Sequence, residues 1–366
     1  MPLAAQPRLL RRIALCAVVL AASVTESTAS DLDDTARFLA GKGVAWSSDL
    51  ADQAQTQAYT DYATQITTGW KHFQQPNLER MRTWSKSHVP AKYSTVFYPF
   101  GGPDLGNALA LFPDADSYVL FGLEAPGEIP DLHALDEAAI SSGLNELKAS
   151  LSTILQVNYF FTKSMEKKLG KGSFNSVSGL LLFFLAMSDC EVTNARLVAI
   201  RGGALVQGTA GIPGVEIAFR RSGGKEQTIR YFMVNVADAS LAKSSRDFLP
   251  YLESQRRFVT LIKSASYLMH RAKEPTRFEQ IRSLILSRSD FIVQDDSAVP
   301  LRLFARDTWK LQFHGRYDTP TQEFVKHLQK DLKVEFQRNS TGKLPFSYGY
   351  AYRQGESNLM TAERAW

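Results

Sequence analysis

The order of apolar and polar positions divides the chain into a short leader, a helical region and a longer region that contains strands. The leader carries three arginines in its first twelve residues, at positions 8, 11 and 12. An apolar run follows over residues 13–24, and the leader ends in small polar residues. The run is shorter than the roughly twenty residues that a membrane-spanning helix needs, and this order is typical of a secretory signal peptide. We therefore predict a signal peptide over residues 1–30 and a periplasmic or secreted protein, with an uncleaved membrane anchor as the alternative.

Residues 31–90 carry apolar side chains at helical spacing, for example at Ala58, Tyr62 and Ile66. A spacing of four residues places such side chains on one face of a helix. We expect an N-terminal helical layer over this range and an α/β domain over residues 91–366.

The pattern changes at the start of the second region. TVFYPF (95–100) and SYVLFGLE (117–124) are runs of β-branched and aromatic residues typical of buried strands, and LGNALALF (105–112) between them has helical spacing. A strand, a short helix and a strand within about thirty residues indicate a βαβ unit with parallel strands. We predict an α/β fold with a mixed, largely parallel central sheet flanked by helices, of Rossmann-like texture.

Later segments extend this pattern. VEIAFRR and TIRYFMVNV flank a Gly-Gly turn and predict a hairpin, while DFIVQDD predicts a buried strand that ends in two acids. Helices are expected over residues 131–169, 177–187 and 321–332. In FSYGYAY, aromatic residues alternate with small ones and are expected to line one face of a strand, namely Phe346, Tyr348, Tyr350 and Tyr352.

Several predicted strands end in polar or acidic residues. In an open parallel sheet, ligands bind outside the carboxyl ends of the strands, where partial burial raises the pKa of a carboxyl group towards values useful in acid–base catalysis. The candidate catalytic residues are Asp104, Glu124, Lys263, Asp295 and Asp296, and the candidate ligand-binding residues are Gly101, Gly102, Asn235, Gln294 and Ser297. In the alternative, each acid only caps a helix or begins a turn, and Lys263 forms a structural ion pair.

The glycines of GGPDLG and the acid Glu124, about twenty residues later, invite comparison with sites for dinucleotides or S-adenosylmethionine. However, Gly101, Gly102 and Gly106 do not form G-x-G-x-x-G, and Pro103 removes a backbone N–H from any anion cradle. Export would also separate the protein from a routine supply of such cofactors. We therefore predict that the protein uses no cofactor.

Other chemistries have little support in the sequence. No two histidines lie at metal-ligand spacing, so no metal is predicted, and S-x-x-K occurs without the partner motifs of serine enzymes. Cys190, the one cysteine beyond the leader, is predicted to be a buried packing residue. The formal charge of +5 falls to +3 without the leader, and basic residues form no long runs, so nucleic acid is not an expected partner.

Four blocks of the chain, FYPFGGPD, FPDADSYVLFGLE, IKSASYLMH and IVQDDS, resemble those of a family of exported bacterial proteins of unassigned function. The resemblance covers most of the chain beyond the leader. It implies a bacterial periplasmic or secreted protein without a transmembrane span after signal cleavage. It carries no activity, so no residue acquires a role from it.

Two functions fit these observations. One is a cofactor-independent hydrolase that acts on an envelope or extracellular substrate, with a carboxylate as general base. The other is a non-catalytic ligand-binding or assembly protein of the cell envelope, whose site holds an unidentified small molecule or envelope ligand. The sequence leaves open whether the protein is an enzyme.

Overall fold

The computed structural model describes residues 29–157, 176–265, 277–320, 322–350 and 356–365. The predicted signal peptide therefore lies almost entirely outside the described residues. Among the helices that are described, none combines the length and the apolar character needed to cross a membrane.

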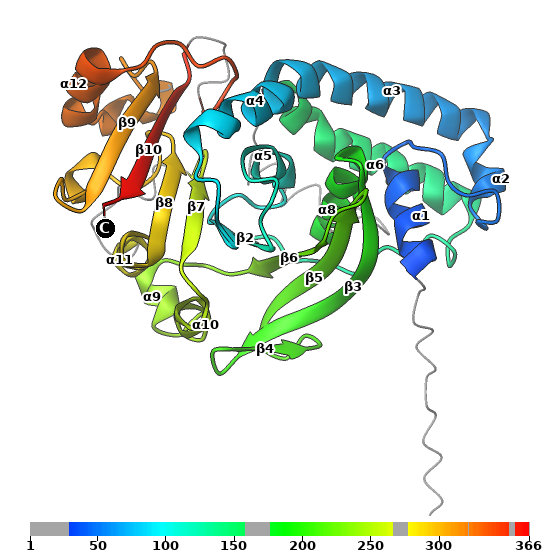
Figure 1. The fold of residues 1–366 in the computed structure, drawn as a ribbon. Helices are drawn as coiled ribbons and strands as arrows, with labels where there is room; N and C mark the ends of the chain where they lie inside the picture. The colour runs from blue at the N-terminus through cyan, green and yellow to red at the C-terminus, as the bar shows by residue number, and fades with distance from the viewer. Residues whose placement is uncertain (1–28, 158–175, 266–276, 321, 351–355, 366) are drawn as a thin grey trace, which may run out of the picture.

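A mixed sheet of ten strands organises the described part of the chain (Figure 1). The strands lie in the order β4-β3-β5-β6-β2-β1-β7-β8-β10-β9. Their bounds are Thr95–Tyr98 (β1), Ser117–Gly122 (β2), Cys190–Arg201 (β3), Ala204–Gln207 (β4), Ile212–Arg221 (β5), Glu226–Met233 (β6), Phe258–Ile262 (β7), Ser289–Gln294 (β8), Trp309–Gly315 (β9) and Asn358–Arg364 (β10).

Five neighbouring strands at the centre, β6, β2, β1, β7 and β8, run parallel, and antiparallel strands extend the sheet on both sides. The predicted α/β class and mixed sheet are confirmed. Among the described strands, however, five of the nine pairings are antiparallel, so the sheet is less parallel than expected. The reason lies partly in β3 to β6, where tight glycine-containing turns join β3 to β4 and β5 to β6, because such turns permit only antiparallel pairing.

Helices cover both faces of the sheet and create an apolar core on each (Figure 1). One face is covered by α1 (Ala29–Leu39), α3 (Gln57–Phe73), α4 (Glu79–His88), α5 (Leu105–Leu111), α6 (Glu137–Val157) and α8 (Val177–Met187). The other face is covered by α9 (Asp238–Leu241), α10 (Phe248–Ser254), α11 (Glu279–Arg288) and α12 (Lys330–Asn339). Because both faces are covered, β1, β2, β7 and β8 are largely continuous buried runs, whereas β6 alternates between buried and partly exposed residues.

Several predicted elements are confirmed. The helix predicted over residues 177–187 is α8, which is buried along its whole length, as its lack of a polar face requires. The predicted hairpin is formed by β5 and β6, and Cys190 is a buried free thiol. The helix predicted over residues 131–169 is α6 over Glu137–Val157, and the residues that follow it up to Asn175 lie outside the described part.

Two predicted elements are wrong. A 3-10 turn occupies Gln322–His327, and α12 begins only at Lys330. The described residues of FSYGYAY form no strand, because Phe346 packs against Trp84 of α4 while Tyr348 donates a hydrogen bond of 3.0 Å to the carbonyl of Ile262. Both aromatic side chains are buried, but against different neighbours, and an alternating sequence pattern does not specify such packing. Tyr352 lies outside the described residues.

A cluster of rings joins β9 to α4. The buried imidazole of His314 lies 5.1 Å from the indole of Trp84 and 5.0 Å from the ring of His88, measured between ring centroids. Its Nδ1 is hydrogen-bonded to the hydroxyl of Thr341, and its Nε2 has no hydrogen-bond partner among the described residues. Burial and the neighbouring His88 lower the pKa of His314 to about 4.

This cluster predicts a loss of stability in mild acid. The folded protein holds His314 neutral, whereas the unfolded chain protonates it near pH 6.5, so the stabilisation is complete above that pH and is lost as the pH falls towards 4. We expect wild type to lose about 2–3 kcal/mol more than His314→Gln between pH 7 and pH 4, measured by urea unfolding. The exposed His72→Gln variant should follow wild type; equal pH slopes for wild type and His314→Gln would contradict the prediction.

Candidate functional site

The order of the parallel strands reverses between β1 and β7. From β1 the chain proceeds to β2 and then β6 on one side, and later returns to place β7 and β8 on the other. In open α/β sheets, ligands bind outside the carboxyl ends of the strands at such a point of reversal. The loops that leave β1 and β7 here carry two of the predicted site residues, Asp104 and Lys263.

Asp104 and Lys263 form a fully buried ion pair that joins these two loops. The Lys263 Nζ lies 2.5 Å from the Asp104 Oδ2, and their side chains are only 1% and 3% exposed. The hydroxyl of Tyr98 donates to the same carboxylate oxygen at 3.0 Å, and the Asn107 Nδ2 donates to the other at 2.7 Å. Asp104 directly precedes α5, yet its side chain does not cap that helix, so the role as a simple helix cap does not apply.

Burial sets the electrostatics of this pair. It lowers the pKa of Lys263, while the charges of Asp104 and Asp295 oppose that shift. Burial likewise raises the pKa of Tyr98 well above its usual value, and the neighbouring Asp104 adds to the shift, so the Tyr98 hydroxyl stays a proton donor to the carboxylate. The positive charge of Lys263 is therefore balanced inside the protein by the negative charges of Asp104 and Asp295.

Asp295, at the end of β8, extends the network beside Lys263. Its carboxylate accepts hydrogen bonds from the backbone N–H of Ser264 at 2.9 Å, from the backbone N–H of Ser297 at 3.0 Å and from the Ser297 hydroxyl. Burial raises the pKa of Asp295, and these hydrogen bonds oppose the shift. Gly349 closes over it so tightly that a Cβ there would lie 2.3 Å from Oδ2, so a side chain at this position would clash.

Asp296 points to different partners from those of its neighbour. Its Oδ1 accepts a hydrogen bond of 2.9 Å from the Asn358 Nδ2, at the start of β10, and its backbone N–H donates to the Asn358 Oδ1. The residue is half-buried. Burial and then the charge of Asp295 raise the pKa of Asp296 to about 7, the value that suits a general base at neutral pH.

The loops of the ion pair contain strained backbone. Phe100, after β1, has a φ of 62°, and Ser264, after β7, has a φ of 51°. Side-chain-bearing residues seldom adopt such conformations, which persist only where the surroundings hold them in place. The buried pair and the Asp295 hydrogen bonds supply that restraint.

Glu124 belongs to a separate group of atoms at the same edge of the sheet. A Cβ on Gly122, the last residue of β2, would lie 2.7 Å from the Glu124 Oε2, 2.7 Å from the Tyr231 hydroxyl and 3.2 Å from the Cα of Gly102. The Tyr231 hydroxyl donates to the Glu124 carbonyl at 2.8 Å. We call Gly102, Gly122, Glu124 and Tyr231 the carboxyl-edge group; Glu124 is its half-buried acid.

The remaining predicted residues have mostly structural contacts. Gly101 packs on the ring of Tyr98, the Asn235 Oδ1 accepts from the backbone of Ala237, and the Gln294 side chain binds the backbone of Val299 in both directions. No group of three or more His, Cys, Asp or Glu residues in the described ranges is arranged to hold a metal ion.

Sequence reasoning missed the aromatic hydroxyls of the site. Tyr98, Tyr231 and Tyr348 all lie within apolar or aromatic runs, where each counts as a core residue. A buried tyrosine usually needs a hydrogen-bond partner for its hydroxyl. Tyrosines within these apolar runs therefore indicate that polar groups lie nearby, and this was the signal in the sequence that could have identified them.

The buried pair predicts a large and specific loss of stability. Asp104→Asn leaves the Lys263 ammonium without its direct counter-charge, and we expect it to lower the free energy of unfolding by about 3–5 kcal/mol in urea denaturation. The double variant Asp104→Asn/Lys263→Met should recover a substantial part. In the control pair Asp116 and Lys225, both side chains are more than half exposed, so Asp116→Asn should cost less than about 1 kcal/mol. An equal cost for the two single variants would refute the prediction.

No protein-family model matches the sequence, and no functionally curated protein matches it. The functional argument therefore depends on the geometry of the carboxyl ends of the parallel strands.

Proposed function

We propose that the protein binds a small molecule with vicinal hydroxyl groups, such as a sugar or the ribose of a nucleoside, at the carboxyl-edge group. The observation that carries this proposal is the half-buried residue Glu124 close to Gly102, which has no side chain. A carboxylate accepts hydrogen bonds from two adjacent hydroxyls, and backbone without side chains allows a ring to approach closely.

The position of the acid supports this assignment. In doubly wound folds, an acid about twenty residues beyond the first glycine turn hydrogen-bonds the ribose hydroxyls of a dinucleotide. Glu124 stands in that relation to Gly102, whose φ is +54° and where an added Cβ would meet no atom within 4 Å. Gly102 itself is buried, and the proposal places the ligand in the space beside its Cα.

The contacts of the other acids favour binding over catalysis by the ion-pair network. A general base must reach a substrate proton at hydrogen-bonding distance. The carboxylate of Asp104 is engaged by Lys263, Tyr98 and Asn107, and that of Asp295 is hydrogen-bonded to Ser264 and Ser297. We propose that this network holds the loops in place while the ligand binds outside it.

The predicted signal peptide bears on the choice of ligand. We propose that the protein is exported to the periplasm or beyond, where free sugars and envelope glycans are available and nucleotide cofactors are not routinely supplied. We therefore expect a free sugar to be the preferred ligand.

The proposal is tested by titrating the mature protein with monosaccharides in one arm and nucleosides in the other, followed by NMR. At least one arm should give saturable binding, and Glu124→Gln should weaken it about ten- to a hundredfold, because a charged acceptor contributes about 1.5–3 kcal/mol. Glu128→Gln, an exposed acid in the same loop, should bind as wild type does. Absence of binding in both arms, or unchanged affinity in Glu124→Gln, would overturn the proposal.

Hydrolysis is the second candidate function, and Asp296 is the observation that favours it. Asp296 is a half-buried residue whose carboxylate accepts a hydrogen bond from Asn358, and its pKa of about 7 lets it take up a proton at neutral pH, as a general base for water must. The substrate would then be an ester or glycoside of the envelope or the extracellular medium.

A screen of chromogenic esters and glycosides tests this second candidate. Activity should rise with pH through about 7, because the base acts in its deprotonated form, and Asp296→Asn should lower kcat by about a hundredfold or more. Asp307→Asn, at an exposed acid, serves as the matched control. Turnover that is unaffected by Asp296→Asn, or no turnover at all, would exclude the role.

A further inference from the structure

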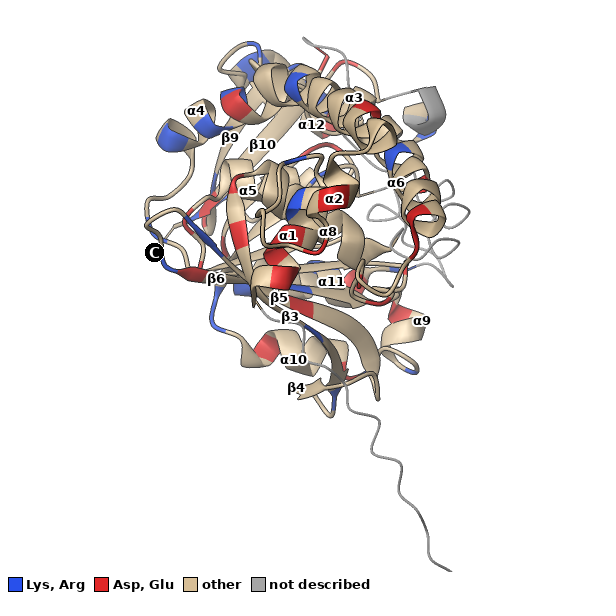
Figure 2. Ribbon diagram, turned by 90° about the vertical axis from the view of Figure 1, so that its right-hand side faces the viewer, with Lys and Arg blue, Asp and Glu red and all other residues tan. Residues whose placement is uncertain are grey.

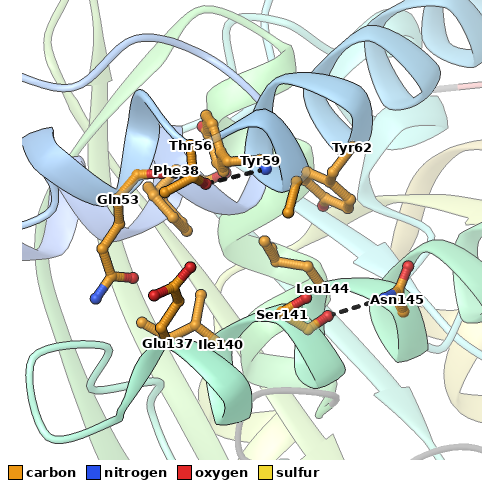
Figure 3. Close-up of a pocket in the computed structure, with 11 residues that line it drawn as sticks. Phe38, Gln53, Thr56, Tyr59, Tyr62, Glu137, Ile140, Ser141, Leu144 and Asn145 are labelled. Atoms are coloured by element: carbon orange, nitrogen blue, oxygen red, sulfur yellow. Dashed lines mark hydrogen bonds between the residues drawn. The ribbon is translucent and has the colours of Figure 1, made fainter.

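A small cavity lies within the helical layer, between α1, the α2–α3 segment and α6 (Figure 3). The short helix α2 spans Ala51–Ala54. The cavity has a volume of about 60 Å³, and its apolar walls are formed by Phe38, Tyr59, Tyr62, Ile140 and Leu144. A water molecule needs roughly 10–15 Å³ by the same measure, so the cavity has room for about four heavy atoms.

The polar groups of the lining are mostly engaged elsewhere. The hydroxyls of Tyr59 and Tyr62 point away and donate to backbone carbonyls of residues 38, 39 and 42. The Thr56 hydroxyl accepts from the backbone of Tyr59, and the Asn145 Nδ2 donates to the Ser141 carbonyl (Figure 3). These side chains offer few hydrogen-bond donors to a ligand.

Gln53 and Glu137 contribute two acceptors to the lining of the cavity. The Oε1 atom of Gln53 is buried and has no hydrogen-bond partner among the described residues. Glu137 is an exposed residue in the first turn of α6, its carboxylate extends towards the side chain of Gln53 (Figure 3), and it makes no ion pair with any described residue. If the Gln53 amide turned to donate to Glu137, one carboxylate oxygen would still lack a donor.

The surrounding helices add to the negative potential. Together α1, α2 and α6 carry six acidic and two basic side chains. Figure 2 shows acidic residues on α1 and α2 on the face towards the viewer. A local excess of acids attracts cations, and the attraction acts before contact is made.

We propose that this cavity binds a small primary ammonium ion that carries two or three carbons. The alkyl chain fits the apolar walls formed by the tyrosines, Ile140 and Leu144, and the ammonium group donates hydrogen bonds to Gln53 Oε1 and to the Glu137 carboxylate. An ammonium ion has three donors and no acceptor, which matches a lining that presents acceptors. The site shares no residue with the carboxyl-edge group, so it does not depend on the function proposed there.

Ligand-observed NMR with propylammonium and its neutral analogue propanol tests the proposal. We expect propylammonium to bind in the millimolar range, as its few heavy atoms permit, and at least about ten times more tightly than propanol. Glu137→Gln should weaken the binding of propylammonium about tenfold and leave that of propanol unchanged. Glu128→Gln, which removes an exposed acid outside the cavity, should alter neither.

Three outcomes would overturn the proposal. Equal affinities for propylammonium and propanol would mean that only the apolar walls contribute. Unchanged affinity in Glu137→Gln would place the cation elsewhere. Absence of saturable binding of either compound to wild type would mean that the cavity holds only water.

Discussion

The buried ion pair between Asp104 and Lys263 is the contact on which the arrangement of the carboxyl ends depends. Two charges removed from water are tolerated only when each has its counter-charge and further hydrogen bonds. Tyr98 and Asn107 supply those bonds to Asp104, and Asp295 adds a second negative charge beside Lys263. The pair thereby fixes the loops after β1 and β7, where the strand order reverses.

The same network explains why Asp104 and Asp295, two acids that the sequence places at strand ends, are buried. Asp104 and Asp295 are held by groups of the protein itself, and the strained conformations of Phe100 and Ser264 persist because these contacts hold them. The carboxylates of Glu124 and Asp296 also accept hydrogen bonds from the protein, from the Leu123 N–H and the Asn358 Nδ2, but both residues keep partial exposure at the border of the network. The chemistry available to a ligand is therefore at the border, on a rigid support, an arrangement that favours a preorganised binding site.

The helical layer is part of the same packing unit. Side chains of α1, α3 and α4 share one apolar core with α8 and with the inner face of the central strands. The ring cluster around Trp84 and His314 joins α4 to β9, far away in the sequence. The cavity beside α6 is where this packing is incomplete. The helices that meet there bring acceptor groups to the cavity but few hydrogen-bond donors.

The sequence by itself determined the elements whose signal is local. Apolar runs specified β1, β2, β8 and α8, and the Gly-Gly turn specified the β5–β6 hairpin, because burial and turn geometry act over a few neighbouring residues. The sequence also singled out Asp104, Lys263 and Asp295 from their positions at strand ends.

Only the tertiary structure decided how those residues combine. The meeting of Asp104 with Lys263, the turning of Asp296 towards Asn358 and the closure of Gly349 over Asp295 all depend on strand order. The packing of FSYG between α4 and the end of β7 has the same origin. These contacts join segments that lie far apart in the sequence, and they arise from the order of the strands in the sheet, which local patterns of apolar positions do not specify.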